Sequence, residues 1–317
     1  MKDRTPQIIK GNVIGVDIGG TNIRAGLVNQ NGELCGEPIS IPTLGNELPD
    51  AIIQRITGAI STVIEKNKLR KEKIVGIGMG VTGPLDIKNG LILECPQLPT
   101  LQYFPLREKI KEVFGIPVIM NNDANAMILG ESLFGSGKGS RIVLGFTLGT
   151  GLGCAIVLDQ KLQTGARELA GEIWASPYKE GIIEDYVSGR GIRNIYTLRS
   201  GLVLSALEIA RLASTGDIIA KEALDQFGTA LGFALAWSIN LIDPDVIILG
   251  GSISNSFPLF SKSMIAFLHK FACPPPSILP PIHTASLGNN AGLIGAAALV
   301  LIMDQSTLNQ PATNTEL

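Results

Sequence analysis

Two short turns rich in glycine contain the first residues of this sequence whose types suggest chemistry. Gly19-Gly20-Thr21-Asn22 follows the apolar run Val13–Val16 and Asp17, and Ile23–Val28 resumes the apolar pattern. Apolar runs on both sides of a short polar turn predict a β-hairpin. Paired glycines leave backbone N–H groups bare, so this turn could hold a phosphate. An ordinary tight hairpin is the alternative, because short motifs also occur by chance.

The same outline occurs again at Val143–Leu158, with Gly149-Thr150-Gly151 as its turn. Laid on Val13–Val28, this stretch keeps a valine, two glycines and an alanine in the same places. A strand that ends in glycine follows each hairpin, at Ile74–Gly83 and at Val246–Ser252. One plan used twice predicts two lobes with a nucleotide between them.

Further polar residues lie where predicted elements meet. Val118–Met120 predicts a strand and Ala124–Leu133 a helix, so Asn122 or Asp123 lies at the start of that helix. Gly250-Gly251 lies between a predicted strand and a predicted helix, where α/β proteins bind anions or nucleotides. Each position also has a plain structural interpretation, as a helix cap for Asp123 and as close packing for the glycine pair.

The remaining pattern predicts an α/β protein. Apolar residues at helical spacing predict helices, and an irregular acidic segment covers Gln163–Tyr186. The helices are predicted at Pro49–Lys68, Leu106–Phe114, Leu204–Ile242, Leu259–Phe271 and Ala291–Met303.

Composition excludes several classes of protein. The 317 residues are 45% hydrophobic, which is ample for buried cores, and the net charge of −2 gives no support to a nucleic-acid partner. The apolar stretch Ala291–Met303 is shorter than the roughly 20 residues that span a bilayer, so no membrane partner is expected. The N-terminus lacks the apolar core of a signal peptide, so a cytoplasmic location is expected. The four cysteines and two histidines are scattered, so no zinc site is expected.

Five motifs in order resemble the ROK family (repressors, unclassified reading frames and sugar kinases). They are Asp17–Asn22, Gly80–Leu85, Asn122–Asn125, Leu148–Gly153 and Gly250-Gly251, and the resemblance covers about residues 13 to 300. It implies a two-lobed actin-like ATPase (ribonuclease H-like) fold with duplicated βββαβα-type lobes and a central cleft. The implied small lobe is 1–121 with a returning helix in 293–317, and the implied large lobe is 122–292. A homodimer is also expected.

The resemblance implies ATP and Mg²⁺ as cofactors and assigns roles to individual residues. Asp17 would face the metal through water, and Asp123 would be the base that takes the proton of a sugar hydroxyl. The alternatives are a turn residue for Asp17 and a helix cap for Asp123. The phosphates and the adenosine would lie against Gly19, Gly20, Thr21, Asn22, Thr147, Gly149, Thr150, Gly151, Gly250 and Gly251. The sugar would contact Gly83, Gln97, Asn122, Asp123, Glu172 and Glu184.

The chain departs from the family pattern in the sugar region. Ala175 occupies a position where a zinc-binding histidine is usual, Trp174 replaces a usual glycine, and no cysteine lies between Cys154 and Cys273. Gln97 stands where asparagine is usual. No structural zinc is therefore expected, and the hexose specificity is left open. For Glu172 and Glu184 a solvated acidic loop is the alternative.

The function implied by the resemblance is an ATP-dependent hexose kinase of the glucokinase type, acting on the 6-hydroxyl of glucose. A kinase of N-acetylated hexosamines and a sugar sensor without activity are alternatives. A repressor of the same family is not expected, because only 16 residues precede Asp17 and the charge is near neutral. Another actin-like phosphotransferase would leave the paired glutamates and the proline-rich loop around Gln97 without a role.

Overall fold

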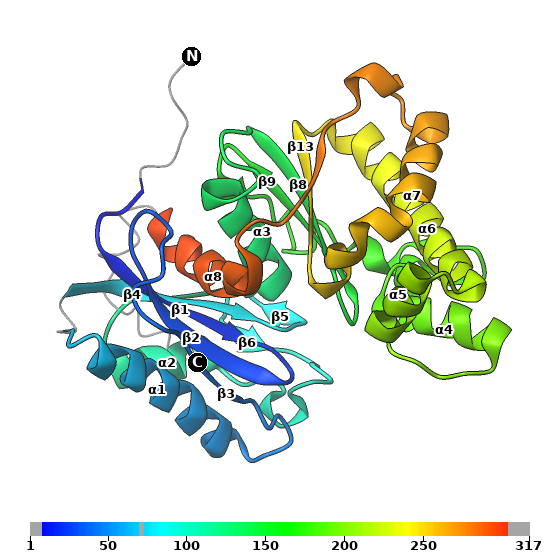
Figure 1. The fold of residues 1–317 in the computed structure, drawn as a ribbon. Coiled ribbons are helices and arrows are strands. Elements are labelled where there is room, and N and C mark those ends of the chain that lie inside the picture. The colour runs from blue at the N-terminus through cyan, green and yellow to red at the C-terminus, as the bar shows by residue number, and fades with distance from the viewer. Residues whose placement is uncertain (1–7, 70–72, 304–317) are drawn as a thin grey trace. The chain divides into compact units, whose positions relative to one another are not determined.

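The first of two five-stranded sheets begins the chain (Figure 1). The computed structural model describes residues 8–69 and 73–303, and the sheets are counted within these residues. The first sheet has the order β3-β2-β1-β4-β7, in which β1, β4 and β7 are parallel and β2 and β3 are antiparallel to their neighbours. Its strands are β1 (Asn12–Ile18), β2 (Asn22–Val28), β3 (Ile39–Pro42), β4 (Ile74–Val81) and β7 (Val118–Asn122).

The second sheet repeats this plan with the order β10-β9-β8-β13-β14. An antiparallel hairpin, β8 with β9, is followed by the parallel neighbours β13 and β14. Its strands are β8 (Ile142–Leu148), β9 (Leu152–Leu158), β10 (Lys161–Leu162), β13 (Val246–Gly250) and β14 (Ile282–Thr284). The predicted duplication is therefore confirmed.

The two hairpins differ in the length of their turns. Ile18 pairs with Ile23 in the first hairpin, whereas Leu148 pairs with Leu152 in the second, so the second turn is one residue shorter. Ala25 consequently lies opposite Val16, but Ala155 lies opposite Gly145. The sequence correspondence of Ala25 with Ala155 is wrong, since an alignment without a gap slips by one residue after the turn.

Contacts divide the chain into two compact units. The first comprises residues 1–139, 159–162 and 287–317, and the second comprises 140–158 and 163–286. The first unit holds α1 (Pro49–Lys66), α2 (Leu106–Phe114), α3 (Asp123–Phe134) and α8 (Ala291–Leu301). The lobe boundaries expected at residues 121/122 and 292/293 stay a prediction. Residues 304–317, which were assigned to the small lobe, lie outside the described residues.

Helix α8, in red in Figure 1, packs against β1, β4 and α3 of the first unit. Glycines make this close approach possible, because a Cβ at Gly15 would lie 2.1 Å from the Leu293 carbonyl oxygen. A Cβ at Gly78 would lie 1.8 Å from the Ala296 carbonyl oxygen. A strand residue with a side chain would therefore push the helix away, and the helix that the sequence predicted at Ala291–Met303 is buried as expected.

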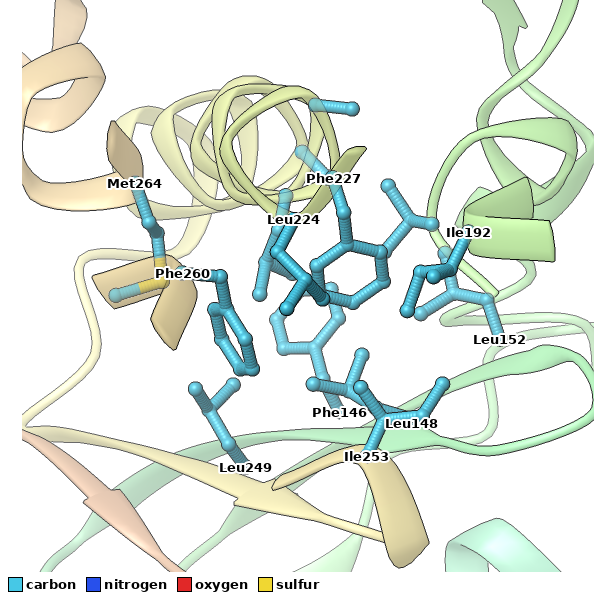
Figure 2. Packing of buried hydrophobic residues seen from close by; sticks show 14 of the residues in the cluster. Phe146, Leu148, Leu152, Ile192, Leu224, Phe227, Leu249, Ile253, Phe260 and Met264 are labelled. Carbon is cyan, nitrogen blue, oxygen red and sulfur yellow. The ribbon is translucent and has the colours of Figure 1, made fainter. Parts of the chain in front are cut away.

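The second unit holds the helices α4 (Gly189–Ser200), α5 (Ala206–Thr215), α6 (Ile218–Ile242) and α7 (Phe257–Phe271). The single helical stretch predicted over Leu204–Ile242 is two helices, because Gly216 takes the left-handed conformation that ends α5 and the Asp217 side chain caps α6. Figure 2 shows the core between these helices and the second sheet, where Phe227 and Phe260 contact each other with ring centroids 5.0 Å apart.

Short elements complete the described chain. They are β5 (Leu85–Asp86), β6 (Leu91–Ile92), β11 (Pro177–Tyr178), β12 (Gly181–Ile182), and the short 3-10 helices η2 (Pro99–Leu101), η3 (Ile173–Ala175), η4 (Ile183–Asp185), η5 (Ser252–Ser256), η6 (Pro276–Ile278) and η7 (Gly288–Asn290). Within residues 8–69 and 73–303, no helix has the length and apolar character needed to cross a bilayer.

Candidate active site

The carboxyl ends of the three parallel strands of the first sheet bring several predicted site residues together. Asp17 lies near the end of β1 beside Gly80 of β4, and Gly80 lies beside Asn121 of β7. A Cβ at Gly80 would lie 3.5 Å from the Cα of Asp123, so this glycine leaves room for the start of α3. The ends of parallel strands are the usual place for ligand sites in α/β proteins.

Asn122 and Asp123 begin α3 in different ways. The Asn122 side-chain oxygen accepts hydrogen bonds from the N–H groups of Ala124 (2.9 Å) and Asn125 (3.4 Å), so Asn122 is the helix cap. The Asp123 carboxylate accepts from Ala124 at 2.7 Å through one oxygen. Burial raises the pKa of Asp123, and its hydrogen bonds to backbone N–H groups oppose that rise. Asp123 is therefore a desolvated carboxylate next to the cap, not the cap itself.

Asp17 is a second acid in the same place. Its pKa rises from 3.8 to about 6, chiefly because of burial and then because of the negative charge of Asp123, while Arg24 lowers it. Arg24 lies opposite Asp17 on β2. It donates to the carbonyl oxygen of Asn289 and to Asn290 Oδ1, the latter at 3.0 Å, so it also ties β2 to the segment that precedes α8.

The first turn of α8 lies against the carboxylate of Asp17. A Cβ at Gly292 would lie 2.5 Å from Asp17 Oδ2. The positive end of a helix dipole favours a negative charge, so this helix end partly offsets the cost of burying Asp17. Gly292 and Arg24 were not predicted from the sequence as site residues. Arg24 could have been found from the hairpin register, because the residue opposite Asp17 follows once the turn length is fixed.

The first glycine turn offers free backbone donors. Gly19 N donates to Asn22 O at 3.0 Å, which closes the turn, and the buried Thr43 holds it through its hydroxyl, which donates to Gly19 O at 2.6 Å. Gly20 and Thr21 are exposed, and their N–H groups donate to no protein atom in the described part of the chain. Thr43 thus fixes the turn, while the N–H groups of Gly20 and Thr21 remain available to bind a phosphate.

Two further predicted sugar residues adjoin these groups. A Cβ at Gly20 would lie 2.9 Å from Cβ and Cγ of Gln97, so the Gln97 side chain lies on the turn. A Cβ at Gly83 would lie 3.3 Å from Nδ2 of Asn122. The first unit therefore groups Asp17, the turn, Gly83, Gln97, Asn122 and Asp123.

The second glycine turn is built differently. Gly149 N donates to Gly151 O at 3.1 Å, and Gly189 N, in the first turn of α4, donates to Gly149 O at 2.8 Å. Gly251, with a φ of 81°, lies so close that a Cβ would be 2.3 Å from the Leu148 carbonyl oxygen. Thr147 lies opposite Gly250 in the parallel pairing of β8 with β13. Figure 2 shows Leu148, Leu152, Ile192 and Ile253 in the hydrophobic core of the second unit.

Glu184 supports this second turn. Its Oε2 accepts from Leu152 N at 2.9 Å and its Oε1 accepts from Arg190 at 3.0 Å. A Cβ at Gly151 would lie 2.5 Å from Glu184 Oε2, so the turn and the carboxylate are in contact. Both carboxylate oxygens thus have partners inside the second unit. Arg190 was missed, because nothing in its local sequence distinguishes it from other surface arginines.

Glu172 precedes η3 and is exposed. Trp174, of which 37% is exposed, donates through Nε1 to Glu172 Oε2. Burial and then the charge of Glu172 raise the pKa of Cys154 to about 12, which places the carboxylate near that thiol and keeps the thiol protonated. In the described ranges 8–69 and 73–303, the other carboxylate oxygen of Glu172 accepts no hydrogen bond, and the residue is exposed on the second unit.

The residues present fit a magnesium–nucleotide ligand in the first unit. Asp17 and Asp123 place two carboxylates near each other with only Arg24 as a cation affecting the Asp17 pKa. Carboxylates together with phosphate oxygens and water are the ligands that Mg²⁺ prefers. The exposed donors of the adjacent turn suit phosphate oxygens.

The fold is that of the actin-like ATPase sugar kinases. A ROK-family glucokinase of Streptomyces griseus in complex with glucose and AMPPNP is 28% identical, with a TM-score of 0.77 over 91% of this chain and 99% of that chain. Residues 13–302 match the ROK family, and the chain belongs to this family. A glucokinase of Halalkalibacterium halodurans is 31% identical over 92% of this chain and 96% of the relative. An N-acetyl-D-glucosamine kinase of Photobacterium profundum is 32% identical over 90% and 98%.

Proposed function

We propose that this chain transfers the γ-phosphate of ATP to the 6-hydroxyl of glucose. Its family and its likeness to a glucokinase complexed with glucose and AMPPNP support the coarser activity, and the chain is a sugar phosphotransferase. The observation that carries the proposal is the pair of partly buried acids, Asp17 and Asp123, whose pKa values are raised by burial, beside a turn with free backbone donors. ATP and a hexose are thus the proposed partners.

Asp123 is the proposed general base. In the transfer, the sugar hydroxyl oxygen bonds to the γ-phosphorus, the bond from that phosphorus to the β–γ bridging oxygen breaks, and the hydroxyl proton passes to the carboxylate. Burial raises the pKa of Asp123, which makes its ionised form a stronger base than an exposed aspartate. Asn122 fixes the start of α3 and thereby the position of Asp123.

Asp17 is the proposed ligand of Mg²⁺, through water. The bound ion would neutralise negative charge on the β- and γ-phosphates. The N–H groups of Gly20 and Thr21, with Gly19 and Asn22 in the same turn, would bind phosphate oxygens.

The second unit would bind the rest of the nucleotide. Thr147, Gly149, Thr150 and Gly151 are the proposed phosphate contacts, and Gly250 with Gly251 the proposed adenosine contacts. Glu172 and Glu184 remain the proposed ligands of sugar hydroxyls. Glu184 also has a structural role, because its carboxylate accepts a hydrogen bond from Leu152 N beside the second glycine turn. A homodimer, a cytoplasmic location and the absence of structural zinc stay predictions.

A kinase of N-acetylated hexosamines is the second candidate function. The N-acetyl-D-glucosamine kinase of Photobacterium profundum is as similar to this chain as the glucokinase of Halalkalibacterium halodurans. Trp174 and Ala175 also change the region that would border the 2-substituent, and both are exposed. A sugar sensor without turnover would keep the same fold but release no ADP.

A coupled assay of ADP release over about eight hexoses, including N-acetylglucosamine and N-acetylmannosamine, tests the proposal. We expect glucose to give the highest kcat/KM. Asp123→Ala should lower kcat by about 10²–10⁴ while ATP binding, measured by calorimetry, is kept. Asp225→Asn, which changes an exposed carboxylate of α6, is the control. Turnover by Asp123→Ala within a few-fold of the wild type would refute the role of the base.

A further inference from the structure

The thiol of Cys95 lies in the loop that follows β6 and points at a predicted sugar residue. Cys95 is 2% exposed, and its Sγ donates to Gln97 Oε1 at 3.3 Å. A longer contact of 3.7 Å joins Sγ to the carbonyl oxygen of Thr82. One S–H carries one proton, so the shorter contact to Gln97 is the better bond.

The loop geometry holds this pair in place. Leu98 N donates to Cys95 O at 3.0 Å, which closes a turn around Gln97, and Leu98 is fully buried. A Cβ at Gly45 would lie 2.2 Å from Gln97 O, so a second loop backs the same residue. The main chain of Gln97 is therefore fixed on both sides while its side chain is exposed.

The Gln97 side chain extends from the phosphate turn to the Cys95 thiol. Its Cβ and Cγ lie over Gly20, and its amide oxygen reaches Cys95. Burial raises the pKa of the Cys95 thiol, and the negative charge of Asp123 adds to this rise. Within the described residues, the side-chain NH₂ group of Gln97 makes no hydrogen bond.

We propose that Cys95 is a positioning residue that holds the side-chain amide oxygen of Gln97. The side-chain NH₂ group of Gln97 is thereby presented as a donor to an oxygen of the sugar. The inference rests on the proposed function and deepens it, since it assigns a specificity contact to this chain's own residues. The favoured substrate carries an acceptor oxygen at this point, either a hydroxyl or an acetamido carbonyl.

Two physical features support the pair. Burial raises the pKa of Cys95, so the thiol keeps its proton at neutral pH and remains a donor. A carboxamide that is not held by its oxygen can rotate by 180° and offer oxygen in place of nitrogen.

Substitutions at Cys95 test the proposal through the sugar KM. Cys95→Ala removes the donor, and one neutral hydrogen bond corresponds to about 2- to 10-fold, so we expect the sugar KM to rise by that factor with kcat within about twofold. Cys95→Ser keeps a donor and should restore most of the loss. Cys35→Ala, a half-buried cysteine elsewhere in the first unit, is the matched control.

A double-mutant cycle separates positioning from mere packing. In a Gln97→Ala background, Cys95→Ala should have no further effect on the sugar KM, because the group it positions is gone. Equal effects of Cys95→Ala and Cys95→Ser, or a full independent effect of Cys95→Ala in the Gln97→Ala background, would overturn the inference.

A ligand-free measurement keeps this test apart from the proposed function. In protein labelled with ¹⁵N-glutamine, the side-chain NH₂ pair of Gln97 is assigned by its loss in Gln97→Ala. We expect Cys95→Ala to shift this pair and Cys95→Ser to return it toward the wild-type position, whereas Cys35→Ala leaves it unmoved. If the pair does not respond to Cys95→Ala, the inference fails, whatever the activity. If the wild type releases no ADP with any hexose, the proposed function fails while this result stands.

Discussion

Single residues of the first unit hold negative charge in a place that water reaches poorly. Asp17 is half-buried and feels the negative charge of Asp123, and Arg24 offsets only part of the resulting rise in its pKa. The same arrangement would favour a divalent cation, whose charge exceeds that of the arginine. The acids thus make the unliganded site less stable than a neutral one would be, a common feature of functional sites.

The pKa of Asp17 predicts a pH-dependent gain in stability for Asp17→Asn. The pKa is about 6 in the folded chain against an ordinary 3.8, so unfolding releases a proton between these values and stability falls as pH rises through them. The penalty is absent below about pH 4 and complete above about pH 6. Removing the charge should therefore raise the free energy of unfolding at pH 8 by on the order of 1–3 kcal/mol. This corresponds to a rise of about 2–6 °C in the thermal midpoint.

Calorimetry of both proteins at pH 4 and pH 8, without nucleotide, measures this difference. The thermal midpoints of the two proteins should coincide at pH 4. Turnover by the variant should be strongly reduced at both pH values. Asp225→Asn is again the control. A midpoint difference that is the same at both pH values would show that the charge of Asp17 is not the cause.

Among elements, those with a clear apolar period could be predicted, whereas the helix α4 and the short strands β3 and β14 were not predicted at their residues. The sequence predicted α2 with the bounds that the structure has, and it predicted that β4 begins at Ile74. It did not predict α4, whose first turn contains Gly189 and Gly191 and so reads as a loop. A close local contact requires one of these glycines: Gly191 lies against the main chain of Asp185 and Tyr186, where a Cβ would be 2.7 Å from the nearest atom.

The candidate site follows the same division. The glycine turns and Asp123 could be found because their motifs are local in sequence. Gly292 could not be found from a local pattern, since it contacts Asp17, a residue distant in sequence. Arg24 follows from the hairpin register only once the turn length is known. Arg190 lies six residues from Glu184 and belongs to no recognisable motif. The bonds of Glu184 to Leu152 and Arg190 likewise depend on how the segment after β9 folds back on the turn.

The contact of α8 with β1 predicts the effect of Gly292→Ala. The new Cβ would lie 2.5 Å from Asp17 Oδ2, so either the carboxylate or the helix end must shift. Alanine is favoured over glycine in a helix by about 1 kcal/mol, which offsets the strain in stability but not the displacement of Asp17. We expect kcat to fall by about 10- to 100-fold, with the thermal midpoint within a few degrees of the wild type.

Steady-state kinetics and calorimetry on the same preparations check this result. Gly58→Ala is the matched control, because Gly58 lies within α1 and a Cβ there meets no atom within 4 Å. It should keep full activity and gain a little stability. Unchanged kcat in Gly292→Ala would mean that the position of Asp17 is not critical for transfer.

At the scale of the whole chain, the first unit is assembled from distant segments. It combines residues up to 139 with the short stretch 159–162 and the residues after 286, whereas the second unit consists of 140–158 and 163–286 and includes nothing beyond Ser286. Helix α8 supplies buried residues to the first unit, among them Leu293, Ile294, Leu299, Val300 and Leu301. Such a topology makes the two units unequal in their dependence on the C-terminal part of the chain.

A chain that ends at Ser286 should therefore lose the fold of the first unit and keep that of the second. Burying a large apolar side chain contributes about 1.5–3 kcal/mol, so the five residues together contribute roughly 7–15 kcal/mol. That is as much as the whole stability of a typical domain, about 5–15 kcal/mol. Hydrogen exchange measured by mass spectrometry should show lost protection in β1, β4 and β7 and retained protection in β8 and β13. A chain that ends at Met303, which keeps α8, is the control, and protection of β1 in the shorter chain would contradict the prediction.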